Sequence, residues 1–456
     1  MNGRWRGRGD WRSTGGRGRG GRQWAHPASY QQKADDRAPS PPIGTLIETI
    51  KHQDLPSTAE PGQGEPKISD CDFLGSFNWM SGEGPTIAIP GKPPVWKPLS
   101  SPIQLEEDAG EYFRDQNAAR SPDSPFEPAV HALLAQNATL SPPEFDLFAC
   151  GSTLGSLLRF ARDVDKPFRF TVEVVGRTVF FVRRENSPDE KLVDVRGYGH
   201  SFPEKYAPWE AEVEGSESHQ RMISYTFAGL RCIVRFEGDG YLADEVQQPL
   251  PKDDLPPPTD TGHLSVRHAG KKVPQEAIFD LKTRSAKRQD DDILSEELPR
   301  LWITQIPHFV LAFHERGTFR DIRVNNVREE VQAWEMLNAN ALRKLGALVH
   351  KIVALARKSR DGKCEVRCRA RGTLEIHAQL PDAPRPVSAR LCERWTGKRV
   401  SPAVSEDGDA SDGASASSGD GGELDKEDET AFSDEEAEKD YTACSELCGY
   451  CGRCGY

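Results

Sequence analysis

Residues 278–285 read IFDLKTRS, a short apolar stretch that carries an aspartate and a lysine two residues apart. Its alternation of apolar and polar residues predicts a half-buried β-strand. Because side chains two apart in a strand point to the same face, Asp280 and Lys282 are expected to lie side by side. Such a pair is either a structural ion pair, which contributes little at a surface, or one half of an active site.

A second acidic motif, FEGDGY at residues 236–241, precedes this strand. Hydrolysis of a phosphodiester with divalent cations needs several hard oxygen ligands at one point and a base or cation that orients the attacking water. Glu237 and Asp239 on one strand, with Asp280 and Lys282 on the next, supply these groups. The alternative for the first pair is turn chemistry, since two glycines interleave with the acids and favour a tight bend.

The elements around the two motifs follow a definite order. The patterns predict a helix at 216–227, strands at 229–237, 240–244 and 276–283, a helix at 293–305 and a strand at 307–314. This order and the D-x-K motif resemble the PD-(D/E)XK nuclease superfamily. Within it, the stretches FEGDGY, FDLKTRS and LWITQIPHFVLAFHERG (301–317) are similar to the 5′-end RNA-processing and decapping nucleases that accompany the nuclear 5′→3′ exonuclease.

The resemblance implies roles for individual residues. Glu237, Asp239 and Asp280 would bind Mg²⁺ or Mn²⁺, Lys282 would orient the water or stabilise the phosphate, and Gln305 would be a helix-borne polar residue beside the site. The subgroup also carries an acid upstream of these strands. Glu217, at the start of the predicted helix, is our candidate for it, with Glu212 and Glu214 behind. Asp280 stands where the subgroup has glutamate, a change that the wider superfamily permits.

The expected fold is an α/β (α+β) domain with a PD-(D/E)XK-like mixed central sheet flanked by helices, spanning residues 141–380. Only 36% of the chain is apolar, with 40 Gly and 34 Pro, so much of it is expected to lie outside a packed core. We expect a disordered arm at 1–40, a linker with short apolar docking islands at 41–140, an acidic disordered tail at 381–440 and a cysteine-rich segment at 441–456.

The first 22 residues hold seven Arg, eight Gly and two Trp, an RGG-type composition. Arginine contacts phosphates and stacks on bases, and tryptophan also stacks, so the composition of this arm predicts binding of nucleic acid, with RNA favoured and DNA as the alternative. The alternative is a solubilising tail. The expected phosphate-binding side chains are Arg4, Arg6, Arg8, Arg17 and Arg19. Arg284, after the D-x-K strand, is a further candidate, with a solvated helix start as its alternative.

The C-terminal part of the chain is acidic. Residues 401–440 hold fifteen Asp or Glu against two Lys, a net charge of −13, whereas the whole chain carries −12. The acidic segment is therefore expected to compete with nucleic acid for the basic arm or to bind a basic partner protein. Beyond it, four thiols lie within eleven residues: Cys444, Cys448, Cys451 and Cys454. They predict a zinc site, with a redox-sensitive or unliganded tail as the alternative.

Several classes of protein are not favoured. No apolar run approaches the roughly 18–20 residues that span a bilayer, and the N-terminus has no apolar signal region, so we expect a nuclear or cytoplasmic protein that is not secreted. The chain also resembles uncharacterised fungal proteins that have carried a geranylgeranyl pyrophosphate synthase label. Prenyl synthases are helical with two DDxxD boxes, and here the acidic run 290–292 has Leu294 where the next acid belongs.

The favoured function from sequence is metal-dependent phosphodiester hydrolysis on nucleic acid, in RNA processing or decay. The alternative is a catalytically inactive nuclease fold that serves as an RNA-binding adaptor. The two functions differ in whether all the acids of the metal site are present. The upstream acid, for which Glu217 is the candidate, is the one that the sequence determines least.

Overall fold

The structure is a computed structural model, and it describes residues 38–56, 64–192, 195–248, 255, 257 and 263–397. The chain forms two compact units, Met1–Pro39 and Ser40–Tyr456. Every helix and strand of the described residues lies in the second unit. Among the described helices, none combines the length and the apolar character that crossing a membrane requires.

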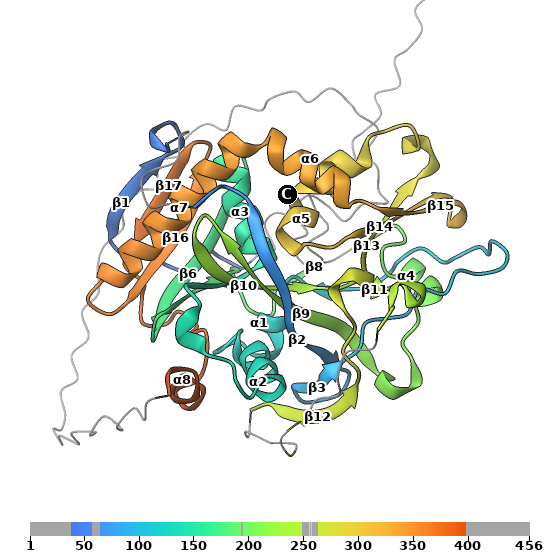
Figure 1. The fold of residues 1–456 in the computed structure, drawn as a ribbon, viewed down its shortest axis with the longest axis horizontal. Coiled ribbons are helices and arrows are strands. Elements are labelled where there is room, and N and C mark those ends of the chain that lie inside the picture. The colour runs from blue at the N-terminus through green and yellow to red at the C-terminus, as the bar shows by residue number, and fades with distance from the viewer. Residues whose placement is uncertain are drawn as a thin grey trace, which may run out of the picture. The chain divides into compact units, whose positions relative to one another are not determined.

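Seventeen strands and eight α-helices lie within the described residues (Figure 1). The strands are β1 (Leu46–Lys51), β2 (Ile68–Met80), β3 (Thr86–Gly91), β4 (Tyr112–Phe113), β5 (Leu147–Cys150), β6 (Phe168–Val175), β7 (Thr178–Arg183), β8 (Lys191–Leu192), β9 (Ser216–Phe227), β10 (Leu230–Glu237), β11 (Gly240–Tyr241), β12 (Ser265–Gly270), β13 (Ile278–Ser285), β14 (His308–Glu315), β15 (Thr318–Asn326), β16 (Lys363–Ala370) and β17 (Thr373–His377). The helices are α1 (Gln116–Arg120), α2 (Glu127–Gln136), α3 (Gly151–Ala161), α4 (Ser201–Tyr206), α5 (Ile293–Thr304), α6 (Arg328–Leu337), α7 (Ala339–Lys358) and α8 (Ala389–Thr396).

A large mixed sheet forms the centre of the fold, in the order β1-β17-β16-β6-β7-β5-β10-β9-β2-β3-β12. Both of its faces are covered, because alternate side chains of one strand enter different cores. In β7, Val179 and Phe181 pack in the core that includes α3 and α7, whereas Phe180 and Val182 pack in the core that includes α2 and α8. The predicted α/β class, with a mixed central sheet flanked by helices, is confirmed.

A second sheet, β11-β13-β14-β15, carries the D-x-K motif. The stretch IFDLKTRS is strand β13, which pairs in parallel with β14 from Phe279↔His308 to Ser285↔His314. Helix α5 connects the two strands, as the sequence order predicted. The strand is buried on both faces rather than half-buried, because parallel strands with helical crossovers are covered on both sides.

Residues 216–227 are strand β9, so the predicted helix there is wrong. The strand lies between β10 and β2 and is buried along almost its whole length, so its apolar residues show no strict alternation. Without that alternation, the spacing of Met222, Ile223 and Phe227 resembled a helical pattern. The partner strand β2 lies about 150 residues earlier in the chain, beyond the reach of a local pattern.

Residues 41–140 differ from the expected linker. Strand β2 lies inside the large sheet, where it pairs with β9 on one side and with β3 on the other. Trp79 and Phe77 are fully buried, and they pack in the same core as α2. The apolar island 73–80 is therefore an internal strand, and the long polar stretches around it hid the pattern that a strand of this length shows. At the other end, α8 lies within the expected acidic tail, which the sequence placed from residue 381.

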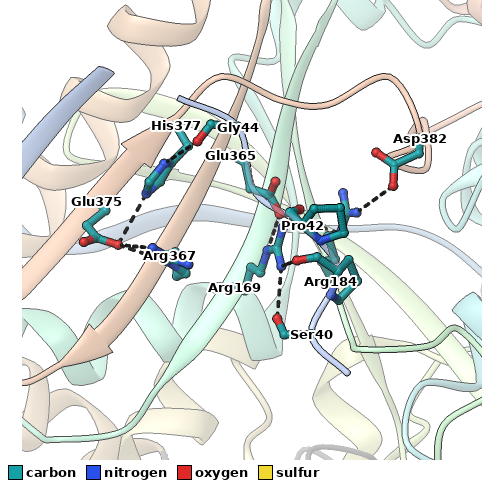
Figure 2. Close-up of polar contacts among 11 residues, drawn as sticks. Ser40, Pro42, Gly44, Arg169, Arg184, Glu365, Arg367, Glu375, His377 and Asp382 are labelled. Atoms are coloured by element: carbon teal, nitrogen blue, oxygen red, sulfur yellow. Dashed lines mark hydrogen bonds and ion pairs between the residues drawn. The ribbon is translucent and has the colours of Figure 1, made fainter. Parts of the chain in front are cut away.

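Strand β1 extends the large sheet at one edge by antiparallel pairing with β17. Figure 2 shows the polar contacts that hold the segment before β1 in place. Arg169 on β6 donates to the carbonyl oxygens of Pro41 and Pro42, at 2.7 Å for the latter, and to Glu365 on β16. The Glu365 side chain is fully buried, and Arg184 approaches it at 3.6 Å. One arginine thus ties the N-terminal segment to two strands of the sheet.

We predict that Arg169→Met lowers the free energy of unfolding by about 3–5 kcal/mol, because it leaves the buried Glu365 carboxylate with a single, more distant cation. Urea unfolding measures this. The control is Arg371→Met, which removes a 64%-exposed side chain paired with Asp163 and is expected to cost less than about 1 kcal/mol. Equal, small losses in both variants would contradict the assigned role of Arg169.

Candidate functional site

Two of the predicted acids come together where β11 meets β13. The antiparallel register pairs Gly240 with Phe279, which places Asp239 across from Asp280. The Asp239 carboxylate accepts a hydrogen bond from the Leu281 amide at 2.7 Å. A Cβ atom on Gly240 would lie 2.3 Å from the Phe279 ring, so the glycine is needed for this close approach. The motif FEGDGY therefore brings an acid against the D-x-K strand.

Helix α5 supplies two charged residues that face β13. Glu297 and Arg300 are three residues apart and lie on one face of the helix. The Arg300 guanidinium donates to both carboxylate oxygens of Asp280 in a bidentate pair, and it also donates to Glu297 at 3.0 and 3.1 Å. The Lys282 ammonium binds the other oxygen of Glu297 at 3.0 Å. Both members of the D-x-K motif are thus paired with α5.

These groups form one buried cluster, which we call the β13–α5 charge network. Its members are Asp239, Asp280, Lys282, Arg284, Glu297 and Arg300, and all of them are less than 9% exposed. Three carboxylates face three cations, so the network is formally neutral. Isolated buried charges are very unfavourable, and this balance is what makes the burial tolerable.

Burial and pairing shift the carboxyl pKa values in opposite directions. Burial, with the negative charges of Asp239 and Glu297, raises the pKa of Asp280 to about 7, although Arg300 acts to lower it. For Glu297, burial acts to raise the pKa, but Lys282 and Arg300 outweigh it and hold the pKa at about 2. Glu297 is therefore ionised at neutral pH and is the anionic centre to which Lys282 and Arg300 bind.

The network as it stands does not fit a bound divalent cation. Both oxygens of Asp280 accept from Arg300, and one oxygen of Asp239 accepts from a backbone amide. Glu237, at the end of β10, is half-buried. Among the described residues, no group of three or more His, Cys, Asp or Glu side chains is placed to hold a metal ion. A doubly charged ion would also leave the neutral network with a buried positive excess.

The other predicted site residues lie elsewhere. Glu217 lies on strand β9 of the large sheet, not at a helix start. Its carboxylate pairs with Arg120 and accepts a hydrogen bond from Gln116 at 2.8 Å. Gln305 is the residue that ends α5, with a left-handed backbone (φ 50°), and its side chain donates back to the carbonyl of Trp302.

Arg284 was predicted to contact phosphates. In the described structure the strand buries its side chain, which lies 3.8 Å from Glu297 and is only 5% exposed. The alternative of a solvated helix start does not describe this buried position.

Glu297 and Arg300 were missed by the sequence reasoning. They lie on either side of Pro299 in the stretch SEELPR. A proline inside a helical pattern leaves the course of the helix undetermined, and with it the helix face that carries these charges. The available clue was their spacing of three on a helix that must cover a strand carrying an acid and a lysine.

The remaining predictions lie outside the described residues. They concern the arginines of the N-terminal arm (Arg4, Arg6, Arg8, Arg17 and Arg19) and the C-terminal thiols (Cys444, Cys448, Cys451 and Cys454). The six cysteines that the structure describes are all free thiols.

Comparison with protein families gives one match, the model described as Domain of unknown function (DUF8563), over residues 60–373. No curated protein matches the chain.

Several solved structures are similar to the chain. Rai1 of Scheffersomyces stipitis, in complex with (3′-NADP)⁺ and calcium ion, is 12% identical with a TM-score of 0.49, over 78% of this chain and 99% of that chain. Rai1 of Candida albicans, in complex with pU5-Mn²⁺, is 11% identical with a TM-score of 0.49, over 77% and 99%. Dxo1 of K. lactis, in complex with manganese, is 9% identical with a TM-score of 0.46, over 74% and 99%.

We predict that Glu297→Gln destabilises the protein by about 3–5 kcal/mol at neutral pH, because it leaves Lys282 and Arg300 with one buried anion fewer. The folded-state pKa of Glu297 lies below its ordinary value of 4.5, so its contribution is present above that pH and is lost as the pH falls toward about 2. The difference from wild type should therefore narrow as the pH falls from about 4.5 to about 2.

Chemical unfolding at several pH values measures this difference. Glu296→Gln is the matched control on the same helix, since Glu296 is half-exposed and pairs with Arg288 at the surface. It is expected to cost less than about 1 kcal/mol at every pH. A Glu297→Gln difference that stays constant with pH would show that the carboxylate charge is not what stabilises the network.

Proposed function

The chain belongs to the DUF8563 family, and we propose from its own geometry that it is a nuclease-fold protein that binds nucleic acid, RNA in the first place, without hydrolysing it. The observation that carries this proposal is the bidentate contact of Arg300 with Asp280. It engages both oxygens of the acid that the D-x-K motif would offer to a metal ion. Lys282, the other member of the motif, is held at 3.0 Å by Glu297 and does not face an open site.

Binding of RNA is proposed from the composition of the N-terminal arm, whose arginines, glycines and tryptophans suit unstructured strands. The same reasoning leaves two further roles as proposals. The acidic segment 401–440 would compete with RNA for the arm or bind a basic protein, and the thiols at 444–454 would hold zinc.

The second candidate is metal-dependent phosphodiester hydrolysis on nucleic acid. It is favoured by the position of Asp239 against the D-x-K strand, in the order that the nuclease motifs require. For this function, Arg300 would first have to release Asp280. The two candidates therefore make opposite predictions for Mn²⁺ and for Asp280.

Incubation of the full chain with 5′-labelled RNA and DNA in Mn²⁺ separates the candidates. We expect wild type, Asp280→Ala and Lys282→Ala to leave every substrate intact, because the network keeps both motif residues paired. Cleavage by wild type that is lost in both variants would overturn the proposal in favour of the nuclease. Circular dichroism of the variants shows whether a loss reflects unfolding.

The role of the arm is tested by the salt dependence of RNA affinity. Replacement of Arg4, Arg6, Arg8, Arg17 and Arg19 by Ala removes five cations, and for single strands this should reduce the slope of log K against log salt by about 3.5. Fluorescence anisotropy with labelled RNA measures the slope. The matched control replaces the same residues by Lys, which keeps the charges and should preserve the slope. An unchanged slope in the Ala variant would assign RNA binding, if any, to another surface.

A further inference from the structure

We infer that Arg300 takes the place of a divalent cation in the β13–α5 charge network, so that Asp239 and Asp280 become a cation site only when this guanidinium is removed. The inference deepens the proposed function and rests on it, because it names the group that keeps hydrolysis from occurring. It concerns a residue that the nuclease motifs do not include and that the sequence patterns did not single out.

The position of Arg300 is determined by the fold. The residue lies one turn before the end of α5 and is only 5% exposed, so its side chain is enclosed by the protein. Glu297, three residues earlier on the same helix face, accepts from two of its nitrogens. These contacts aim the remaining edge of the planar guanidinium at Asp280, where its two parallel donors match the two carboxylate oxygens.

The charge balance shows why the guanidinium and a metal ion exclude each other. Arginine stays protonated in proteins, so Arg300 contributes a permanent positive charge. With it, three buried cations face the three carboxylates of the network when all are ionised, the state of Asp280 that pairing with Arg300 favours. A divalent cation added to the intact network would leave two uncompensated positive charges in a region that excludes water.

One donor of the network is left without an acceptor. The Nε atom of Arg284 is buried and has no hydrogen-bond partner among the described residues. Its neighbouring nitrogen is 3.8 Å from Glu297, whose oxygens already serve Lys282 and Arg300. Another cation would therefore compete for acceptors that are in short supply. Removal of Arg300 reverses this situation, because the network becomes negative by one charge and both oxygens of Asp280 lose their donors.

The test is Mn²⁺ binding by the full chain without RNA, measured by calorimetry and by the Mn²⁺-dependent shift in melting temperature. We expect Arg300→Gln to bind Mn²⁺ at least tenfold more tightly than wild type. The double variant Arg300→Gln/Asp280→Asn should lose this gain. Arg300→Lys, which keeps a cation at the same position, should bind no better than wild type.

Two results would overturn the inference. The first is Mn²⁺ binding by wild type that Asp280→Asn abolishes, since the intact network would then accept the ion. The second is a folded Arg300→Gln protein that binds Mn²⁺ no more tightly than wild type. If Arg300→Gln does not fold alone, recovery of its folded circular dichroism spectrum on addition of Mn²⁺ supports the inference, and failure to recover overturns it.

These outcomes are distinct from failure of the proposed function. Metal-dependent cleavage of RNA or absence of RNA binding decides that proposal, whereas the Mn²⁺ titrations contain no RNA. An Arg300→Gln protein that ignores Mn²⁺ would leave the proposal of RNA binding unchanged.

Discussion

The buried contact between Arg300 and Asp280 joins the second sheet to the helix that crosses it. Taking an arginine and an aspartate out of water costs several kcal/mol for each ion, and only a close, hydrogen-bonded pair recovers that cost. The pair therefore has little tolerance for a shift of α5 along β13. Because α5 leads directly into β14, the register of the parallel pair β13–β14 depends on the same contact. Local chemistry and chain topology are coupled at this one point.

This coupling gives the residues of the D-x-K motif a different role from the one they would have in a metal site. In a site prepared for metal, the acid must be held in place but left with open coordination sites. Here the acid is held by the very groups that would have to be absent. Lys282 is likewise directed to Glu297, an acid of the protein itself, rather than to a substrate phosphate. In the function that we propose, the motif residues position a helix, and two side chains of that helix keep them from the chemistry that they suggest in isolation.

The sequence predicted those parts of the fold in which the pattern is local. The order of strand, helix and strand at 278–315 is as expected. Patterns failed where the partner is distant, as for β9 and β2. For the site, the sequence gives the acids of two strands, but which face of α5 meets them is decided by packing, and so Glu297 and Arg300 were not foreseen.

The pairing of β1 with β17 has a consequence for the solubility of the protein. Strand β17 pairs with β16 on one side and with β1 on the other, so β1 is what covers its outer row of amide and carbonyl groups. A chain that began after Lys51 would expose this row along five residues, and an uncovered strand edge is a template for pairing with other chains. Strand β1 is itself the strand at this edge of the large sheet, so loss of residues 40–51 would uncover β17 and favour its pairing with another chain.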